Sequence, residues 1–377
     1  MRAITPSSGG SVPVARRQLA AEPAKLIVTL VAVAAAVALV LLLSGLRRGM
    51  GEQVTLYIDH QAPVLVGQRG AHDFLSQTSV LPEALTGEIA RVPGVAEATP
   101  ISQQYAMLQL HGRRVLTLLI GYTPGKPGGP WRLTSGTAPR ASGELVLDRV
   151  LASEHGLRIG STVEYRGARL RVVGLSSGTS GFMTPLAFTT RTTANALSRQ
   201  PGMVNFFLVR PQLGVPPATV AARINRSVMG VSALRRTEVA ANDRRLFIDP
   251  FSGPLLAMVA IAFAVAILVI GLAVYSSTAE RSREYATLKA LGLRQRALLR
   301  LVGAQAVGLA LTGTALGIAL AFGAAGSISA FAPKYLIAIG TGSVVAVAVS
   351  ALVMALIAAL VPARLLARLD PASAFRR

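Results

Sequence analysis

Four stretches of the chain are almost entirely apolar, and each is long enough to cross a lipid bilayer as a helix. A helix rises about 1.5 Å per residue, so about 20 apolar residues span a hydrocarbon core of about 30 Å. No charged residue lies within the four stretches, which run from Leu26 to Gly45, Leu255 to Tyr275, Leu301 to Phe322 and Ser343 to Val361. The pattern predicts transmembrane helices at 26–46, 254–277, 301–322 and 343–361.

The charges beside these stretches predict the orientation. The tail 1–25, the loop 278–300 and the tail 362–377 are all basic, with four basic residues against one acidic, six against two, and four against one. The short loop 323–342 carries a single lysine. Short loops rich in lysine and arginine stay in the cytoplasm. We therefore expect both tails and the loop 278–300 to be cytoplasmic, and the segment 47–250 to lie outside.

The segment 47–250 has the shorter patterns of a mixed α/β domain. Alternation predicts strands at Tyr105–Leu110, Arg114–Ile120, Leu145–Leu147, Val163–Tyr165, Leu170–Val173 and Val204–Val209. His111-Gly112 and Arg166-Gly167 are the turns of two expected hairpins. Helices are expected at Leu81–Val92, Pro217–Met229 and between a cap at Asp148 and Gly156. Residues 123–143, rich in Pro, Gly, Ser and Thr, predict a loop between two lobes.

Two features of the apolar stretches leave alternatives open. The first stretch has the length of a span, and the following Ser44-Gly45-Leu46 is no small-x-small cleavage site, which favours an uncleaved helix over a signal peptide. In the third stretch, Gly313 and Gly317 form a GxxxG pair. Small residues let helices approach closely in lipid. The pair predicts a helix contact, either within the subunit or between two copies in a dimer.

Composition narrows the class of function. The chain of 377 residues is 52% hydrophobic and only 15% charged, against about 25% in soluble domains. It has no cysteine, which excludes disulfides, thiolate metal sites and a cysteine nucleophile. The net charge of +21 raises nucleic-acid binding as an alternative, but much of it lies beside the apolar stretches, where topology accounts for it. We expect a lipid bilayer and no nucleic acid among the partners.

The segment 49–250 keeps an excess of positive charge, with 21 basic and 13 acidic residues. This excess favours a surface close to anionic lipid headgroups, with an acidic ligand as the alternative.

No catalytic, cofactor-binding or metal site is predicted. The four histidines, His60, His72, His111 and His155, show neither an i, i+4 pair nor an HExxH pattern. Gly125-Lys126 resembles the end of a phosphate loop, but it lacks the earlier glycine and the following Ser or Thr. We therefore expect the chain to be no enzyme and to bind no ATP itself.

The most informative cytoplasmic segment starts at Ala279. Tyr285, Leu288 and Leu291 follow three-residue steps on one side of an amphipathic helix. Oppositely charged residues three apart lie elsewhere on its surface, and Gly292 ends it. Taken alone, this pattern also fits a solvated juxtamembrane helix.

Family resemblance favours a docking role. The segment from Glu280 through Gly292 resembles the cytoplasmic ER-x-R/E motif of FtsX-like permeases, which include the MacB-type transporters. The tail from Pro362 resembles the closing motif of that family, and the stretches Val92–Pro100 and Glu144–Gly174 look like parts of the MacB-type periplasmic core. Tyr285-Ala286 departs from the common Ile-Gly pair.

The resemblance implies an α-helical membrane protein with four transmembrane helices and a mixed α/β extracytoplasmic domain. It implies a homodimeric permease subunit in the bacterial plasma membrane, with ATP bound by a separate ABC ATPase subunit. Residues implied in coupling to that ATPase are Glu280, Arg281, Arg283, Glu284, Tyr285, Leu288, Lys289 and Gly292.

The resemblance also implies two functions. In the first, the subunit drives efflux of a hydrophobic or amphipathic substrate by mechanotransmission, with or without a periplasmic adaptor. In the second, an FtsX-like signalling subunit regulates a cell-wall hydrolase and moves no substrate. A membrane-bound enzyme is a third alternative, which no catalytic set supports.

Overall fold

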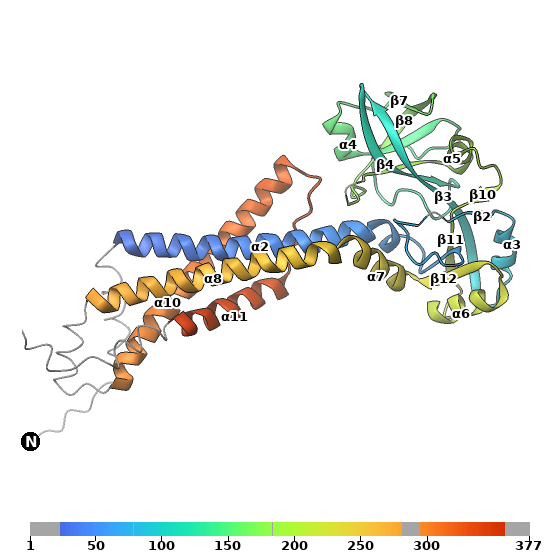
Figure 1. The fold of residues 1–377 in the computed structure, drawn as a ribbon. Helices are drawn as coiled ribbons and strands as arrows, with labels where there is room; N and C mark the ends of the chain where they lie inside the picture. Colours follow the sequence, from blue (N-terminus) through green and yellow to red (C-terminus); the bar gives the residue numbers. More distant parts are fainter. Residues whose placement is uncertain (1–22, 78, 183, 281–294, 359–377) are drawn as a thin grey trace, which may run out of the picture. The chain divides into compact units, whose positions relative to one another are not determined.

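The structure is a computed structural model that describes residues 23–77, 79–182, 184–280 and 295–358. The chain forms two compact units (Figure 1). The helical unit comprises Met1–Gly49 and Ser252–Arg377, and the α/β domain comprises Met50–Phe251. Each unit is described by itself.

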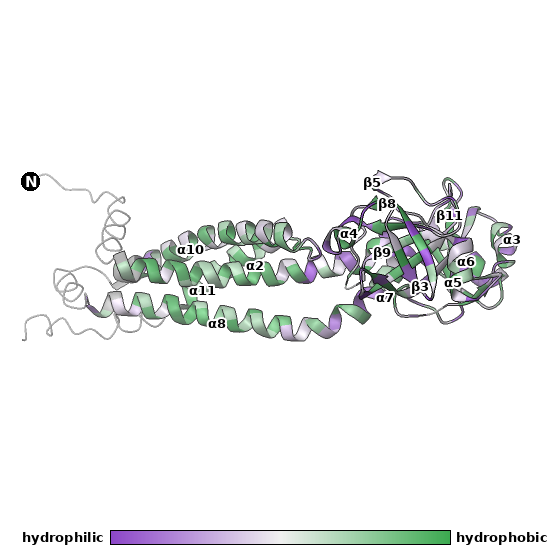
Figure 2. Ribbon diagram, turned by 90° about the horizontal axis from the view of Figure 1, so that it is seen from above, coloured by the Kyte–Doolittle hydropathy of each residue, from purple (hydrophilic) through white to green (hydrophobic). Residues whose placement is uncertain are grey.

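Four helices of the described chain are long and apolar enough to cross a membrane. They are α2 (Pro23–Asp59), α8 (Asp249–Glu280), α10 (Gln295–Phe331) and α11 (Thr341–Ala358). Figure 2 shows hydrophobic residues along most of their length. The four predicted spans thus coincide with four helices. Helices α2, α8 and α10 extend beyond the predicted limits at both ends, and α11 begins two residues before its predicted limit. Residues 359–361 of the fourth predicted span lie outside the described residues.

The four helices share one hydrophobic cluster in the helical unit. Its buried members include Leu41 of α2, Ile270 of α8, Ala306 of α10 and Ala355 of α11. Many members are alanine, which suits close packing of helices in lipid. Helix α8 also carries strongly exposed apolar side chains, such as Leu268 at 70% exposure. Such a surface is unfavourable in water and fits a hydrocarbon environment.

The α/β domain contains one ten-stranded sheet in the order β12-β1-β11-β3-β4-β9-β6-β8-β5, and β7 pairs with β3 and β8. The strands are β1 (Val64–Gln68), β3 (Val95–Leu110), β4 (Arg113–Tyr122), β5 (Leu133–Gly136), β6 (Glu144–Asp148), β7 (Thr162–Tyr165), β8 (Ala168–Ser176), β9 (Leu186–Thr190), β11 (Phe206–Pro211) and β12 (Val231–Arg235). Among the strand pairs of the described residues, only β4–β9 and β6–β8 are parallel. A separate pair is formed by β2 (Leu81–Pro82) and β10 (Met203–Val204).

The long strand β3 joins two lobes, each with its own core. The first lobe packs β1, β11 and β12 against α6 (Pro217–Ser227) and α3 (Leu85–Ala90). The second packs β4, β6 and β8 with α4 (Arg149–Glu154) and α5 (Arg191–Ser198). A third cluster gathers around Tyr57 and Phe74 and includes Val239 of α7 (Arg236–Phe247).

Local sequence signals account for much of this domain. The two predicted hairpins are confirmed as β3–β4 and β7–β8, with positive φ angles at His111, Gly112, Arg166 and Gly167 in their turns. The cap at Asp148 is also confirmed, since its carboxylate accepts hydrogen bonds from the amides of residues 150 and 151.

Two local predictions are wrong. The expected helix at Leu81–Val92 is shortened to α3, because Leu81 and Pro82 pair with β10 as a strand. The predicted loop 123–143 contains strand β5, which adds to the sheet edge beside β8. Both strands depend on a partner distant in sequence, which periodicity does not reveal.

Candidate functional site at the junction of α2 and α7

The last turns of α2 belong to the core of the α/β domain. Val54, Tyr57 and Ile58 are each at most 3% exposed. The Tyr57 ring stacks on Phe74, with centroids 4.8 Å apart and an interplanar angle of 11°. Its hydroxyl donates a hydrogen bond of 3.0 Å to the carbonyl oxygen of Gly128. The i, i+3, i+4 spacing of the three buried residues puts them on one helix face.

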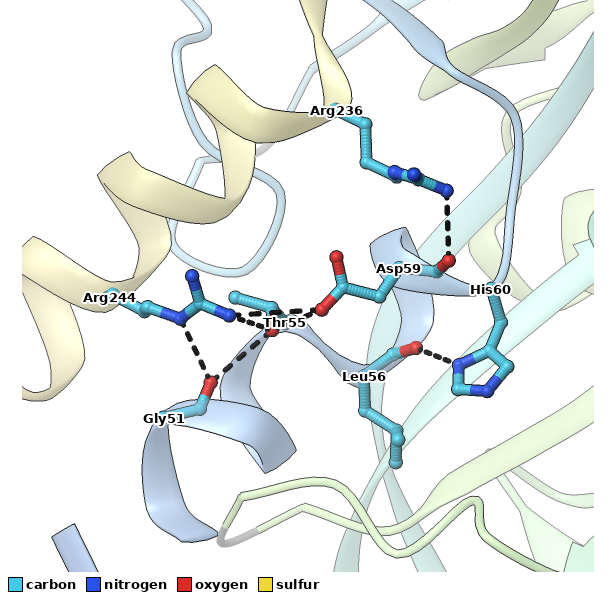
Figure 3. A network of polar contacts seen from close by, with 7 residues as sticks. All are labelled: Gly51, Thr55, Leu56, Asp59, His60, Arg236 and Arg244. Carbon is cyan, nitrogen blue, oxygen red and sulfur yellow. Dashed lines mark hydrogen bonds and ion pairs between the residues drawn. The ribbon is translucent and has the colours of Figure 1, made fainter. Parts of the chain in front are cut away.

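Arg244 of α7 connects that helix to the end of α2 (Figure 3). Its Nε donates to the carbonyl oxygen of Gly51 at 3.3 Å, and its Nη2 donates to the Thr55 hydroxyl at 3.0 Å. The Thr55 hydroxyl, which is fully buried, donates to Asp59 Oδ2 at 2.6 Å. Asp59 Oδ2 also lies 3.9 Å from Arg244 Nη2. One guanidinium thus contacts three residues of α2.

A second arginine binds the C-terminus of α2. Arg236 Nη1 donates a hydrogen bond of 3.1 Å to the carbonyl oxygen of Asp59, and the Arg236 amide donates to the carbonyl of Pro63. His60 Nδ1 lies 2.8 Å from the carbonyl oxygen of Leu56 (Figure 3). The last carbonyls of a helix lack intrahelical partners and carry partial negative charge, so cationic donors there are stabilising.

Asp243 connects α7 to the segment that follows β1. Its side chain is fully buried, and Oδ1 accepts hydrogen bonds of 3.1 Å from the amides of both Phe74 and Leu75. Oδ2 has no hydrogen-bond partner among the described residues. Burial raises the pKa of Asp243 to about 7, and the neighbouring Asp73 carboxylate adds to the rise. The two amide donors lower the pKa but do not compensate for burial.

The chain enters the α/β domain through α2 and leaves it after α7. Helix α2 is continuous from Pro23 to Asp59. On the other side only Ile248 separates α7 from α8, and its backbone angles remain helical. Within the described residues, no group of three or more His, Cys, Asp or Glu side chains could hold a metal ion. Among the described residues, the junction is held by hydrogen bonds from Arg244 and Arg236 and by the apolar packing of Tyr57 and Ile58.

Most of the coupling residues expected from the sequence lie outside the described residues: Arg281, Arg283, Glu284, Tyr285, Leu288, Lys289 and Gly292. Glu280 is the last residue of α8, where its Oε1 accepts a hydrogen bond of 3.1 Å from the Ser276 hydroxyl.

Gly313 and Gly317 of α10 lie against α2 of the same chain. A Cβ added at Gly317 would lie 2.7 Å from the carbonyl oxygen of Ala34, and one at Gly313 would lie 2.6 Å from Val33 Cγ1. The contact that the structure gives these glycines is within the chain.

The sequence reasoning missed the junction residues Thr55, Asp59, Arg236 and Arg244. One signal was present: the buried face of Val54, Tyr57 and Ile58 continues helical spacing past the apolar stretch. No signal in the sequence pairs an arginine at 244 with a threonine at 55.

The described chain has an α/β domain inserted between the first and second of four helices that are long and apolar enough to cross a membrane. Residues 26–227 match the family of the MacB-like periplasmic core domain, and residues 256–371 match the FtsX-like permease C-terminal family. The chain therefore belongs to the MacB/FtsX family of ABC transporter permeases. This confirms the expected family and fold class.

Relatives that match this chain over nearly its whole length are also named as ABC transporter permeases. An uncharacterized ABC transporter permease of Mycobacterium tuberculosis is 25% identical over 359 residues, covering 93% of this chain and 95% of the relative. One of Mycobacterium bovis is 24% identical over 358 residues, with the same coverage. Among solved structures, the periplasmic region of MacB from Actinobacillus actinomycetemcomitans aligns at 11% identity with a TM-score of 0.38, covering 52% of this chain and 94% of that one. The extracellular domain of YknZ, a noncanonic ABC-type transporter from Gram-positive bacteria, aligns at 9% identity with a TM-score of 0.35, covering 46% and 100%.

Proposed function

We propose that this chain is the permease subunit of a plasma-membrane ABC exporter, which converts ATP hydrolysis by a separate ATPase into movement of the α/β domain. In this proposal two copies form a dimer, both tails face the cytoplasm and the α/β domain lies outside. The cargo is a hydrophobic or amphipathic molecule. The observation that carries the proposal is the junction, where α2 and α7 are attached to each other and to one core.

The energetics favour rigid transmission at this junction. Arg244 and Asp59 are 48% and 44% exposed, so their ion pair contributes at most about 1 kcal/mol. Full burial of an apolar side chain contributes about 1.5–3 kcal/mol, and α2 buries Val54, Ile58 and the ring of Tyr57 here. Apolar burial therefore anchors α2, while Arg244 and Arg236 fix its rotation and depth. A displacement of α2 or α8 then moves the domain as a rigid body.

The cytoplasmic segment after α8 is the proposed docking site for the ATPase. It begins at Glu280 and includes Glu284 and Leu288, which the family resemblance assigns to coupling. Because α8 leads to this segment at one end and to α7 at the other, movement of the docked segment is transferred along one helix.

The same junction serves the second candidate, a signalling subunit that controls a cell-wall hydrolase. The attached helices would then reposition the domain without moving a substrate. Two experiments distinguish signalling from export: affinity capture with the full chain after crosslinking in intact cells, and deletion of the gene. Recovery of a cell-wall hydrolase supports signalling, and a change in resistance to amphipathic compounds on gene deletion supports export.

The test of the coupling uses the full chain purified with its ATPase. Thr55→Val with Arg244→Ala removes the polar contacts of Arg244 with α2 and keeps the apolar anchor of the junction. We expect permease-stimulated ATP hydrolysis to fall severalfold. The matched control is Arg245→Ala, a substitution at the neighbouring exposed arginine of α7. Absence of any nucleotide-hydrolysing protein from the purified complex would refute the proposal, and equal stimulation in the double variant and the control would refute the role of the junction.

A further inference from the structure

A cavity of about 420 Å³ opens beside the end of α2 in the α/β domain. One wall is the segment His60–Pro63, which directly follows the last residue of α2. The segment Lys126–Trp131 forms a second part of the lining, and Tyr122 of β4, Ala138 and Arg210 of β11 complete it. Its size lies in the range of cavities that hold small ligands.

The inner lining is aromatic and apolar. The Trp131 indole stacks on the His60 imidazole, with centroids 4.2 Å apart and an interplanar angle of 10°, and meets the Phe188 ring edge-on. Tyr122 is a buried neighbour whose ring leaves no room for a Cβ at Gly129. Aromatic faces and proline rings bind flat apolar groups with little loss of side-chain entropy.

The rim of the cavity has an excess of one positive charge. Lys126 Nζ and Arg210 Nη2 each lie 2.8 Å from Glu97, on Oε1 and Oε2 respectively. The hydrogen bond from Lys126, together with the charges of Lys126 and Arg210, lowers the pKa of Glu97. The ionised carboxylate neutralises only one of the two cations. Lys126 and Arg210 are 56% and 63% exposed, and both line the cavity. They are therefore accessible to a second anion.

The loop that forms this cavity is fixed to the end of α2. Gln61 Oε1 accepts a hydrogen bond from the Gly128 amide at 2.9 Å, and Gln61 Nε2 donates to the Gly129 carbonyl at 3.3 Å. Tyr57 donates to the Gly128 carbonyl from within α2 itself. A ligand that displaces this loop must break these hydrogen bonds to Tyr57 and Gln61.

We propose that this cavity binds an amphipathic anion, with its flat apolar body against Trp131 and Tyr122 and its carboxylate, sulfonate or phosphate at Lys126 and Arg210. Such a ligand is the cargo or an effector of the permease, or the headgroup of an anionic lipid. The inference goes beyond ATPase coupling, since binding needs no ATPase. Its failure is therefore distinguishable from failure of the proposed function.

The test uses Trp131, the only tryptophan of the chain, as the reporter. The full chain in zwitterionic lipid nanodiscs is titrated with 8-anilinonaphthalene-1-sulfonate, which quenches tryptophan emission by energy transfer. N-phenyl-1-naphthylamine, the same ring system without the sulfonate, is the matched probe. We expect Lys126→Gln with Arg210→Gln to lower the affinity for the sulfonate probe at least about tenfold. The affinity for the neutral probe should stay unchanged.

The control pair, Arg149→Gln with Arg226→Gln, makes the same change in net charge at exposed sites elsewhere on the domain. The proposal is overturned if Trp131 emission responds to neither probe. It is also overturned if the cavity variant and the control variant lose affinity for the sulfonate probe equally. If the variant with both Lys126→Gln and Arg210→Gln binds neither probe, each substitution is made alone and titrated with the same two probes. Each single variant should then lose affinity for the sulfonate probe and keep its affinity for the neutral probe. If phosphatidylglycerol in the nanodiscs competes with the sulfonate probe, the occupant is a lipid headgroup. If it does not compete, the occupant is a soluble amphipathic anion.

Discussion

The buried carboxylate of Asp243 leads to a quantitative prediction for Asp243→Asn. Its pKa rises from an ordinary value of 3.8 to about 7, chiefly because burial disfavours the charged form. Between about pH 4 and pH 7 the native state therefore binds more protons at this site than the unfolded state. The contribution of Asp243 to the free energy of unfolding must fall as the pH rises through this window, and it levels off above about pH 7.

The magnitude follows from the shift. One pKa unit corresponds to about 1.36 kcal/mol, so a shift of about 3 units costs up to about 4 kcal/mol at pH 8. Asparagine keeps an oxygen to accept from the amides of Phe74 and Leu75 and carries no charge. We expect the variant to match the wild type near pH 4 and to exceed it at pH 8. For a domain of this size, 4 kcal/mol corresponds to a rise in Tm of about 8–16 °C.

The assay is thermal unfolding of the full chain in detergent at pH 4.5, 6 and 8, with amide hydrogen exchange at Phe74 and Leu75 as a local measure. Glu97, Glu144 and Glu238 have lowered pKa values and contribute stability that appears as the pH rises. The difference between wild type and variant cancels these contributions. Glu154→Gln, at an exposed carboxylate of α4, is the control. Equal pH dependence in the wild type and Asp243→Asn would falsify the reasoning.

Three further predictions test other parts of the molecule. Gly317→Ala places a Cβ 2.7 Å from a carbonyl of α2 and should destabilise the helical unit, whereas Gly323→Ala, which meets nothing within 4 Å, should not; the measurement is thermal unfolding in detergent. Tyr57→Phe leaves the ring stack intact and removes the hydrogen bond to Gly128, which should cost about 1 kcal/mol in unfolding free energy. Because the chain has no cysteine, Met229→Cys at an exposed site should react with an impermeant maleimide on intact cells, and Ser7→Cys only after permeabilisation. The reverse labelling would contradict the proposed orientation.

The number of spanning-length helices, the mixed α/β class and two hairpins were predictable from the sequence because each depends on local chemistry. Apolar length defines a span, and positive-φ turns such as Arg166-Gly167 define a hairpin. The family was predictable because the Glu280–Gly292 segment and the C-terminal motif are contiguous in sequence. The roles of Glu284 and Leu288 in docking stay predictions.

Only the tertiary structure decided how α2 ends and what surrounds it. Thr55 and Arg244 are far apart in sequence, and their hydrogen bond depends on how α7 packs against α2. The same holds for the cavity, because Lys126, Trp131 and Arg210 come from a loop and a strand that the sheet order brings together. A pattern of residues determines which side chains are apolar or charged, whereas long-range packing determines which of them meet.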